Sequence, residues 1–402
     1  MTYKICGCDL VVYGRVSLGA GHTLTLKDNG SVWAAGVNTF GQLGIDPRRY
    51  AKMTTFMEIM SGGGKAVAAG GGHSMVLKQD GSVWGTGRNK YGQLGDGSNS
   101  DKDTFAQVML GYAKAVATGI EHSLVAMQDG SVWATGYNLH GQLGDGALAD
   151  RNRFSQVISD GAEAVAAGTR HSMVLMQDGS VWFAGENKYG QLGAGSVHLK
   201  RTFVLVIPSG AKAIAAGSSH SIILRLDGSV FVTGDNEYGQ LGDASTESKR
   251  NFVRVISGGA VVIAAGFMHS IVLKRDGSVW GTGRNNVGQL GNGPTTFRST
   301  FMQVISSGIK DVAAGGWHSM VQKTDGSLWS TGANMNGQLG DGSSSTKHKY
   351  VRVLLSPDGA WSTALLYPDF VAFGLCIAAL VCLDNASYLH AQMLTCTVVF
   401  GL

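Results

Sequence analysis

The chain has 402 residues, of which 60 are glycine and only five are proline, and its formal net charge at pH 7 is +4. Hydrophobic residues make up 44% and charged residues 15%, a composition that excludes a disordered or fibrous chain and indicates a folded protein with many tight turns. The net charge is too small for this length to support a nucleic-acid-binding or membrane-surface role.

The first segment, Met-Thr-Tyr-Lys-Ile-Cys-Gly-Cys, has neither the long apolar stretch nor the small-residue cleavage pattern of a signal peptide. The five cysteines all lie near the two ends of the sequence: Cys6, Cys8, Cys376, Cys382 and Cys396. The long middle therefore holds no disulfide, which fits a reducing compartment. We expect an intracellular protein of the cytoplasm or the nucleus.

Three sets of residues recur along the chain with seven members each, and the only change in length is two extra residues between Gly44 and Phe56. The repeat histidines are separated by 51 residues once and by 49 thereafter: His22, His73, His122, His171, His220, His269 and His318. The motif Gly-Gln-Leu-Gly begins at Gly41, Gly92, Gly141, Gly190, Gly239, Gly288 and Gly337. The aromatic set is Phe56, Phe105, Phe154, Phe203, Phe252, Phe301 and Tyr350. A fixed period of this kind indicates a repeat architecture.

The second unit shows the secondary structure that we predict for each repeat. Residues 73–79 and 82–86 are two short strands around the Asp80-Gly81 pair, a strong hairpin signal because glycine tolerates the positive φ of such turns. Residues 66–70 and 104–109 supply two further strands, and no unit has room for a crossover helix. We therefore predict an all-β fold. It is a seven-bladed β-propeller over residues 1–355, with four antiparallel strands per blade, closed where residues 350–354 meet the N-terminal segment.

The sizes of the repeated residues fit a radial arrangement of blades. Alanine pairs such as Ala68-Ala69 and Ala264-Ala265 recur in the strand that we place innermost, where seven blades converge. Tryptophan recurs at a position that we expect to fill the wider gap between adjacent blades, and Phe231 replaces it in the fifth unit. These structural tryptophans are Trp33, Trp84, Trp133, Trp182, Trp280 and Trp329.

The repeated motifs Ala-Ala-Gly-x-x-His-Ser, Asp-Gly-Ser-Val-Trp and Gly-x-Asn-x-x-Gly-Gln-Leu-Gly closely resemble the regulator of chromosome condensation repeat over about residues 10–355. The resemblance implies a seven-bladed propeller. It does not imply one function, because the family includes exchange factors, ligase-associated domains, a photoreceptor and inhibitors.

The repeated residues do not indicate a catalytic, metal or cofactor site. Equivalent histidines on neighbouring blades would be about 10 Å apart, roughly the spacing of packed sheets, whereas zinc needs its nitrogen ligands about 2 Å away. We therefore expect structural, hydrogen-bonded histidines and no bound metal. The Gly-x-Asn-x-x-Gly segments lack the following helix of a dinucleotide site, so we expect no cofactor. No acid, base or nucleophile departs from the repeat pattern, and we expect no enzymatic activity.

The two residues before each repeat histidine vary from unit to unit, and corresponding loops of a propeller lie at one end of the ring. We take five of them as candidate partner-binding residues: Glu121, Arg170, Phe267, Met268 and Trp317. The alternative is that they only pack against nearby loops or have drifted neutrally. A second variable set flanks the loop asparagines and includes Arg88, Asp235 and Arg284. We place that set on the opposite rim.

We therefore expect a non-catalytic platform that binds a protein partner, such as a small GTPase or a ubiquitin-ligase component, through loops on one face. The alternative is a guanine-nucleotide exchange factor for a small GTPase. The resemblance implies that such factors use acidic residues just before the repeat histidine and an inserted hairpin. Here Glu121 is the only acidic residue at those positions, and the near-constant repeat length leaves no space for an insertion.

Other members of the family fit the sequence less well. The photoreceptors cluster several extra tryptophans in these loops, whereas Trp317 stands alone. A chromatin-binding member uses a basic N-terminal arm, whereas Lys4 and Arg15 are the only basic residues before the first hairpin. The repeats are not followed by a ligase catalytic domain in this sequence, so a ubiquitin-related role would need a partner.

The composition changes after Arg352, because the last 50 residues contain no lysine or arginine. Residues 370–383 are an uncharged apolar run of 14, shorter than the roughly 20 that span a bilayer, and Asp384 interrupts its extension. We treat residues 356–402 as an apolar, non-repeat C-terminal tail. It is compatible with a segment packed on the propeller, a loosely ordered tail, an incorrect C-terminal reading of the gene, or a membrane anchor.

Overall fold

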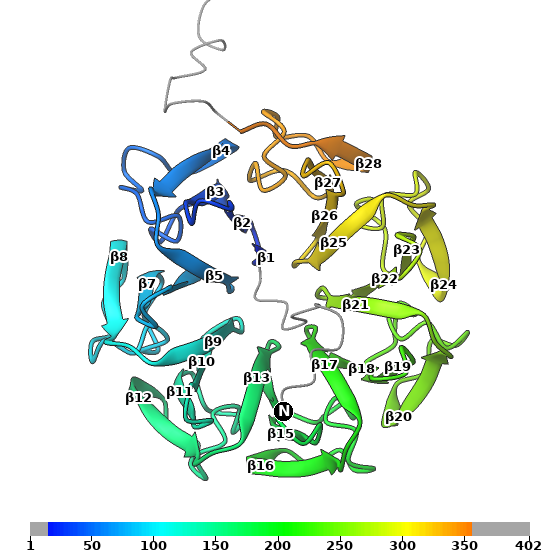
Figure 1. Cartoon of the computed structure of the whole chain (residues 1–402), viewed down its shortest axis with the longest axis horizontal. Helices are drawn as coiled ribbons and strands as arrows, with labels where there is room; N and C mark the ends of the chain where they lie inside the picture. The colour runs from blue at the N-terminus through cyan, green and yellow to red at the C-terminus, as the bar shows by residue number, and fades with distance from the viewer. Residues whose placement is uncertain (1–14, 356–402) are drawn as a thin grey trace, which may run out of the picture. The chain divides into compact units, whose positions relative to one another are not determined.

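A computed structural model of the chain describes residues 15–355, and these form seven four-stranded antiparallel sheets arranged in a ring (Figure 1). The all-β, seven-bladed propeller predicted from the repeat is therefore confirmed. The predicted tail 356–402 and all five cysteines lie outside the described residues. Within the described part of the chain, no helix is long and apolar enough to cross a membrane.

Each blade is a run of four consecutive strands, numbered outward from the axis. The innermost strands are β1 (Val16–Leu18), β5 (Gly64–Ala69), β9 (Ala113–Thr118), β13 (Ala162–Ala167), β17 (Ala211–Ala216), β21 (Ala260–Ala265) and β25 (Ile309–Ala314). The second strands are β2 (His22–Leu26), β6 (His73–Lys78), β10 (His122–Met127), β14 (His171–Met176), β18 (His220–Arg225), β22 (His269–Lys274) and β26 (His318–Lys323).

The two outer strands complete each blade. The third strands are β3 (Val32–Val37), β7 (Val83–Gly87), β11 (Val132–Gly136), β15 (Val181–Gly185), β19 (Val230–Gly234), β23 (Val279–Gly283) and β27 (Leu328–Gly332). The outermost strands are β4 (Lys52–Met60), β8 (Lys102–Met109), β12 (Arg151–Ile158), β16 (Lys200–Ile207), β20 (Lys249–Ile256), β24 (Arg298–Ile305) and β28 (Lys347–Arg352).

Asp-Gly pairs turn the chain between the second and third strands. In blade 2, Gly81 has a φ of 81°, and the Asp80 carboxylate accepts hydrogen bonds from both the backbone N–H and the hydroxyl of Ser82. The hairpin then pairs His73 with Gly87. This register matters for the site, because it brings the residues just before each histidine next to the residues just after the third strand.

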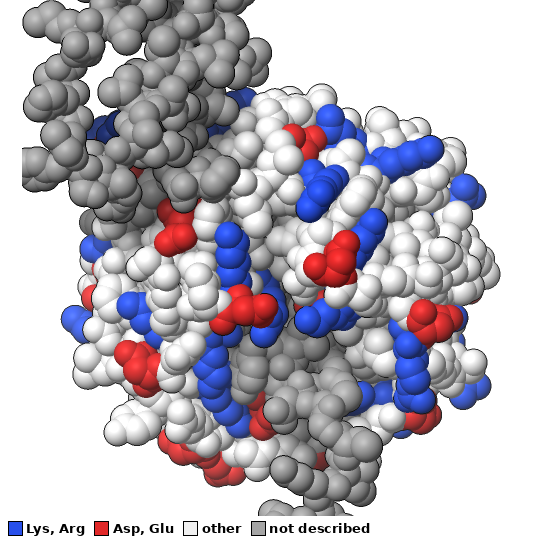
Figure 2. Space-filling view, turned by 45° about the horizontal axis from the view of Figure 1, so that its top comes forward, with Lys and Arg blue, Asp and Glu red and all other residues white. Residues whose placement is uncertain are grey.

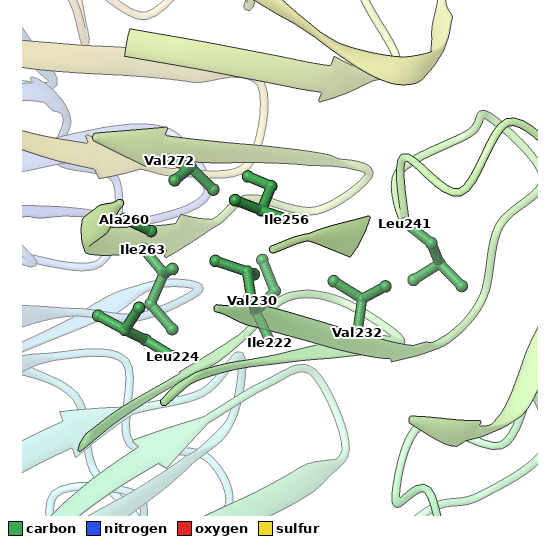
Figure 3. Packing of buried hydrophobic residues seen from close by; sticks show 9 residues of the cluster. All are labelled: Ile222, Leu224, Val230, Val232, Leu241, Ile256, Ala260, Ile263 and Val272. Carbon is green, nitrogen blue, oxygen red and sulfur yellow. The ribbon is translucent and has the colours of Figure 1, made fainter. Parts of the chain in front are cut away.

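Apolar side chains fill the space between adjacent blades. Figure 3 shows one such cluster, in which Ile222, Val230 and Leu241 of blade 5 pack with Ile263 and Val272 of blade 6. The leucine of every Gly-Gln-Leu-Gly motif is fully buried. Burial of a leucine contributes roughly 2 kcal/mol, so this layer is a major part of the stability of the ring.

The second glycine of the Gly-Gln-Leu-Gly motif contacts the aromatic ring of the next blade. A Cβ on Gly95 would lie 2.5 Å from the ring of Phe154, and Gly95 also has a φ of 74°, so both space and backbone require glycine there. The same contact recurs at all seven junctions, ending with Gly340 against Phe56. This contact explains why the glycine motif and the aromatic set keep step along the sequence.

The ring closes between blade 7 and blade 1 without exchange of strands. The outer loop of blade 7 forms a bridge between Asp341 and Thr55, equivalent to the Asp96–Arg153 bridge between blades 2 and 3. Strand β28 ends at Arg352, and the carbonyl of Leu354 then accepts a hydrogen bond from the backbone N–H of Phe56 at 3.2 Å. The last blade therefore packs on the first with the outer-loop bridge seen at other junctions and with an additional backbone hydrogen bond to Leu354.

Candidate functional site

The repeat histidines are fully buried and link each blade to the next. The Nε2 of His220, for example, lies 3.0 Å from the Ser270 hydroxyl of the following blade, and that hydroxyl donates to the carbonyl of Gln240 at 2.7 Å. Because the only hydroxyl hydrogen goes to the carbonyl, the hydroxyl must accept its second bond from an Nε2–H. The last link closes the ring, from His318 to Thr23 at 2.8 Å.

Burial keeps these histidines neutral. It lowers the pKa of His22, His171 and His269 to about 4 and that of the other four to about 3. The Nδ1 of each ring has no hydrogen-bond partner, so a proton added there would be buried and unpaired. Among residues 15–355, no group of three or more histidine, cysteine, aspartate or glutamate side chains is placed to hold a metal ion.

The tryptophans lie at the blade junctions but are less enclosed than we expected. Trp182, for example, packs beside Val132 of the preceding blade, yet only Trp33 is buried. The indole N–H of Trp280 donates to Ser278, and the Lys274 ammonium lies 3.9 Å from the ring centroid. The fully buried filler between blades is therefore the Gly-Gln-Leu-Gly leucine, with tryptophan as its half-exposed, lysine-covered edge.

Both variable sets lie on the same end of the ring, so the prediction that Arg88, Asp235 and Arg284 lie on the opposite rim is wrong. The backbone N–H of Arg284 donates to the carbonyl of Met268 at 2.8 Å, and the N–H of Asp235 donates to that of Ser219 at 2.8 Å. The physical reason is the antiparallel register, which pairs each histidine with the last glycine of the third strand. We call this end, formed by the residues before the histidines and after those glycines, the variable face.

The centre of the variable face opens toward the axis of the propeller. Ala20, Ile120, Thr169, Phe267 and Gly316 line this opening together with glycines and alanines of the inner strands. Neighbouring loops are joined by backbone hydrogen bonds, such as Phe267 N–H to the carbonyl of Gly315 at 3.2 Å. Bonds of this kind join adjacent loops at six of the seven junctions, and together these loops form the inner rim of the face.

Opposite charges are paired on the side of the face formed by blades 2 to 4. Arg88 forms an ion pair with Glu121 at 3.1 Å, across blades 2 and 3, and Arg170 lies 3.7 Å from Glu186 within blade 4. His140 lies 3.8 Å from Glu186, but burial and then the charge of Arg170 lower its pKa, so it is neutral at pH 7. The candidates Glu121 and Arg170 are thus each compensated by a neighbour.

The candidates Phe267, Met268 and Trp317 come together on blades 6 and 7. The rings of Phe267 and Trp317 meet edge to face, with centroids 5.9 Å apart and planes at 81°. Arg284 belongs to the same cluster: its guanidinium carbon lies 4.7 Å from the ring centroids of both Trp317 and Tyr238. All five side chains are half-buried. We call these five residues the aromatic cluster.

Sequence reasoning missed Tyr238 and the position of Arg284. Tyr238 occupies the third variable position of the Gly-x-Asn-x-x-Gly loop, a position that is also aromatic at Tyr91 and Tyr189. Counting residues through the hairpin would have placed Arg284 beside Met268. The stacking itself involves residues of blades 5, 6 and 7, so no local pattern contains it.

The charges that Figure 2 shows are mixed in sign, with lysine and arginine interleaved with aspartate and glutamate on the visible surface. An extended area of one sign, which would attract a polyanion, is not seen there.

Comparison with known proteins finds short stretches of similarity in larger proteins. The chain is 38% identical over 90 residues to the probable E3 ubiquitin-protein ligase HERC4 of Mus musculus, which is 22% of this chain and 8% of HERC4. It is 36% identical over 88 residues to the protein RCC2 homolog of Xenopus laevis, or 22% of this chain and 17% of that protein. The chain thus matches only a small part of these relatives.

Similarity to solved structures extends over the whole ring. The crystal structure of human WBSCR16 aligns with a TM-score of 0.73 at 23% identity, covering 81% of this chain and 94% of that one. The structure of Prp20p from Saccharomyces cerevisiae, reported with its binding properties to Gsp1p and histones, aligns with a TM-score of 0.73 at 21% identity, covering 82% and 87%. At this identity the likeness shows the fold.

The repeat itself identifies the family. The sequence model of the regulator of chromosome condensation (RCC1) repeat matches seven segments, one in each blade: 15–42, 65–93, 113–142, 162–191, 211–240, 260–289 and 309–338. A second model of the same repeat matches 80–126, 178–224, 227–273 and 276–322. The matched segments contain the buried histidine links and the hairpins that build the ring. The chain therefore belongs to the regulator of chromosome condensation (RCC1) repeat family.

Proposed function

We propose that this propeller is a non-catalytic platform that binds a protein partner through the variable face. The observation that carries the proposal is the contrast between framework and face. The histidine links, the buried leucines and the glycine–aromatic contacts recur in every blade, whereas the face differs from blade to blade. A surface that varies while its support is constant is suited to recognition of one particular partner.

The aromatic cluster is the part of the face that we assign to the partner's main contact. Half-buried tryptophan, tyrosine and arginine are the residue types that dominate binding energy at protein interfaces. The Phe267 and Trp317 rings are held against each other at the inner rim, so little side-chain freedom would be lost on binding. The proposal gives the chain no chemical step, and the partner supplies any enzymatic activity of the complex.

Capture of partners from cell extract by the full chain tests this proposal. We expect the double variant Phe267→Ala/Trp317→Ala to weaken capture by about 2 kcal/mol or more, roughly thirtyfold, with little change in melting temperature. Leu226→Ala is the matched control. Leu226 is an exposed apolar residue, 73% accessible, in the turn after β18 at the opposite end of the ring. Equal capture by the double variant and the wild type would show that the face is misplaced.

A nucleotide-release assay on any captured small GTPase separates a platform from an exchange factor. The platform predicts capture without faster release of the nucleotide. Faster release that is lost in Glu121→Gln would favour the exchange factor instead. In the free protein the Glu121 carboxylate is held by Arg88 at 3.1 Å, so exchange through it would first require this pair to open.

A further inference from the structure

The three arginines of the variable face differ in how their charge is compensated. Arg88 pairs with Glu121 at 3.1 Å and Arg170 lies 3.7 Å from Glu186. Arg284 forms no ion pair with any residue that the structure describes. Its guanidinium instead makes cation–π contacts with Tyr238 and Trp317, with the guanidinium carbon 4.7 Å from each ring centroid.

The guanidinium of Arg284 is held in place with part of its hydrogen-bonding capacity unused. Its Nε donates to the side-chain oxygen of Asn286 at 2.8 Å, and its Nη1 lies 3.4 Å from the sulfur of Met268. A guanidinium has five N–H donors, so the Nη2 group and one N–H of Nη1 remain available at its edge. The two ring contacts and these polar contacts restrict the side chain before a ligand binds, which lowers the entropy that binding would have to remove.

An apolar surface adjoins this free edge. Trp317 contacts Arg284, whose guanidinium carbon lies over its ring, and meets Phe267 edge to face with the ring centroids 5.9 Å apart. A ligand that fits both features carries an anionic group and a large apolar group close together. The other two arginines of the face are already paired with carboxylates, so the face offers one available guanidinium rather than the row of cations that a nucleic-acid backbone needs, and a peptide carboxylate fits better.

We propose that the variable face recognises a partner segment in which an aspartate or glutamate lies next to a large apolar residue, with the carboxylate on Arg284 and the apolar side chain on Trp317 and Phe267. A carboxylate and an arginine form charge-assisted, often bidentate hydrogen bonds, which give both affinity and orientation. This inference rests on the proposed function for the choice of face, but it adds the chemistry of the partner.

The probes are four short immobilised synthetic peptides that differ only in a central pair of residues: Glu-Phe, Gln-Phe, Lys-Phe or Glu-Ser. The purified full chain is tested for binding to each peptide. We expect Glu-Phe to bind about tenfold better than Gln-Phe, Lys-Phe or Glu-Ser, with the preference weakening at high salt. In Arg284→Gln the preference for Glu over Gln should disappear. Arg88→Gln is the matched control, since it removes an arginine of the same face that already has a carboxylate partner, and it should keep the preference.

Three outcomes would overturn the inference: no peptide binds, all four bind equally, or Arg284→Gln keeps the preference while its melting temperature matches that of the wild type. Arg284→Lys tests the bidentate contact, because lysine keeps the charge without the planar pair of donors, and binding of Glu-Phe should fall severalfold. Displacement of Glu-Phe by a single-stranded oligonucleotide of the same length, lost in Arg284→Gln, would assign the site to nucleic acid instead.

The result separates this inference from the proposed function. If Phe267→Ala/Trp317→Ala abolishes partner capture while Arg284→Gln does not, the partner binds the variable face as proposed, but it does not do so through an acidic residue on Arg284. If neither variant affects capture, both proposals fail.

Discussion

The stability of the propeller should fall steeply as the pH is lowered from about 7.5 to 5.5, because seven buried histidines must stay neutral for the ring to remain folded. In the folded chain their pKa values are lowered to about 3 or 4 by burial, from an ordinary value of 6.5. In the unfolded chain they titrate near that ordinary value. The unfolded state therefore binds more protons throughout this window, and acid favours unfolding.

The sign and size follow from proton linkage. A group whose folded pKa is depressed keeps its full contribution above the unfolded pKa and loses it as the pH falls toward the folded pKa. Over this window each histidine loses about 1.4 kcal/mol, so seven lose about 9 kcal/mol. Typical domains have about 5–15 kcal/mol of stability in total, so most of it should be gone near pH 5.5. The turn aspartates titrate lower: the Ser82 hydrogen bonds lower the pKa of Asp80 below its usual 3.8.

Urea unfolding followed by tryptophan fluorescence at a series of pH values measures this effect. At about pH 5.5 we expect unfolding to take up about six protons, which is a slope of about 8–9 kcal/mol per pH unit. His220→Gln is the control variant. Its amide can donate to Ser270 but does not titrate, so the slope should decrease by about 1.2 kcal/mol per pH unit. An unfolding free energy that changes by less than about 2 kcal/mol across the window would refute the reasoning.

Three further predictions concern the framework, and each is measured as a change in the free energy of unfolding in urea. Leu290→Ala should cost about 3 kcal/mol, more than Trp280→Ala, because the leucine is fully buried and the tryptophan is half-exposed; a larger effect at the tryptophan would contradict this packing. Gly95→Ala should cost about 3 kcal/mol because of its positive φ and because the aromatic ring lies 2.5 Å from the added Cβ. Gly308→Ala has a similar φ but open space around the added Cβ, and it should cost about 1 kcal/mol. Equal costs would show that the contact with the aromatic ring does not restrict position 95. Ser270→Ala should cost about 1–3 kcal/mol because it leaves the His220 N–H unpaired. Ser270→Thr should be tolerated because blade 1 has threonine at the equivalent position. An alanine variant as stable as the wild type would show that the histidine–serine hydrogen bond does not contribute to stability.

The fold could be predicted from the sequence because the contacts between blades impose the repeat. Gly95 must be a glycine because the ring of Phe154 of the next blade lies against it and because its φ is positive, so two distant motifs must keep a fixed spacing. The Asp-Gly turn and the alternating strands are local signals, and they gave the four strands of each blade. The tryptophans were placed at the correct junctions. The repeat pattern does not reveal that their rings are only partly enclosed there, nor that lysines such as Lys274 lie over them.

The candidate site could be predicted only in part. Variation among the repeats pointed to Phe267, Met268 and Trp317, and the structure brings these three side chains together. It could not show that Glu121 is neutralised by Arg88, because the two residues belong to different blades. The error over Arg284 had a simpler cause: its loop and the loop before His269 are separated by two antiparallel strands, and this hairpin returns the chain to the same end of the ring.

The variable face can change without damage to the fold because its hydrogen bonds use the backbone. In each blade the residue after the third-strand glycine donates its N–H to the carbonyl before the histidine, whether the pair is Arg284 with Met268 or Ala333 with Trp317. The side chains at these positions are therefore not needed to close the hairpin. The buried histidine below them keeps its own link to the next blade. Substitutions on this face should alter what the propeller binds while the ring beneath it stays closed, and this separation allows binding and stability to be tested independently.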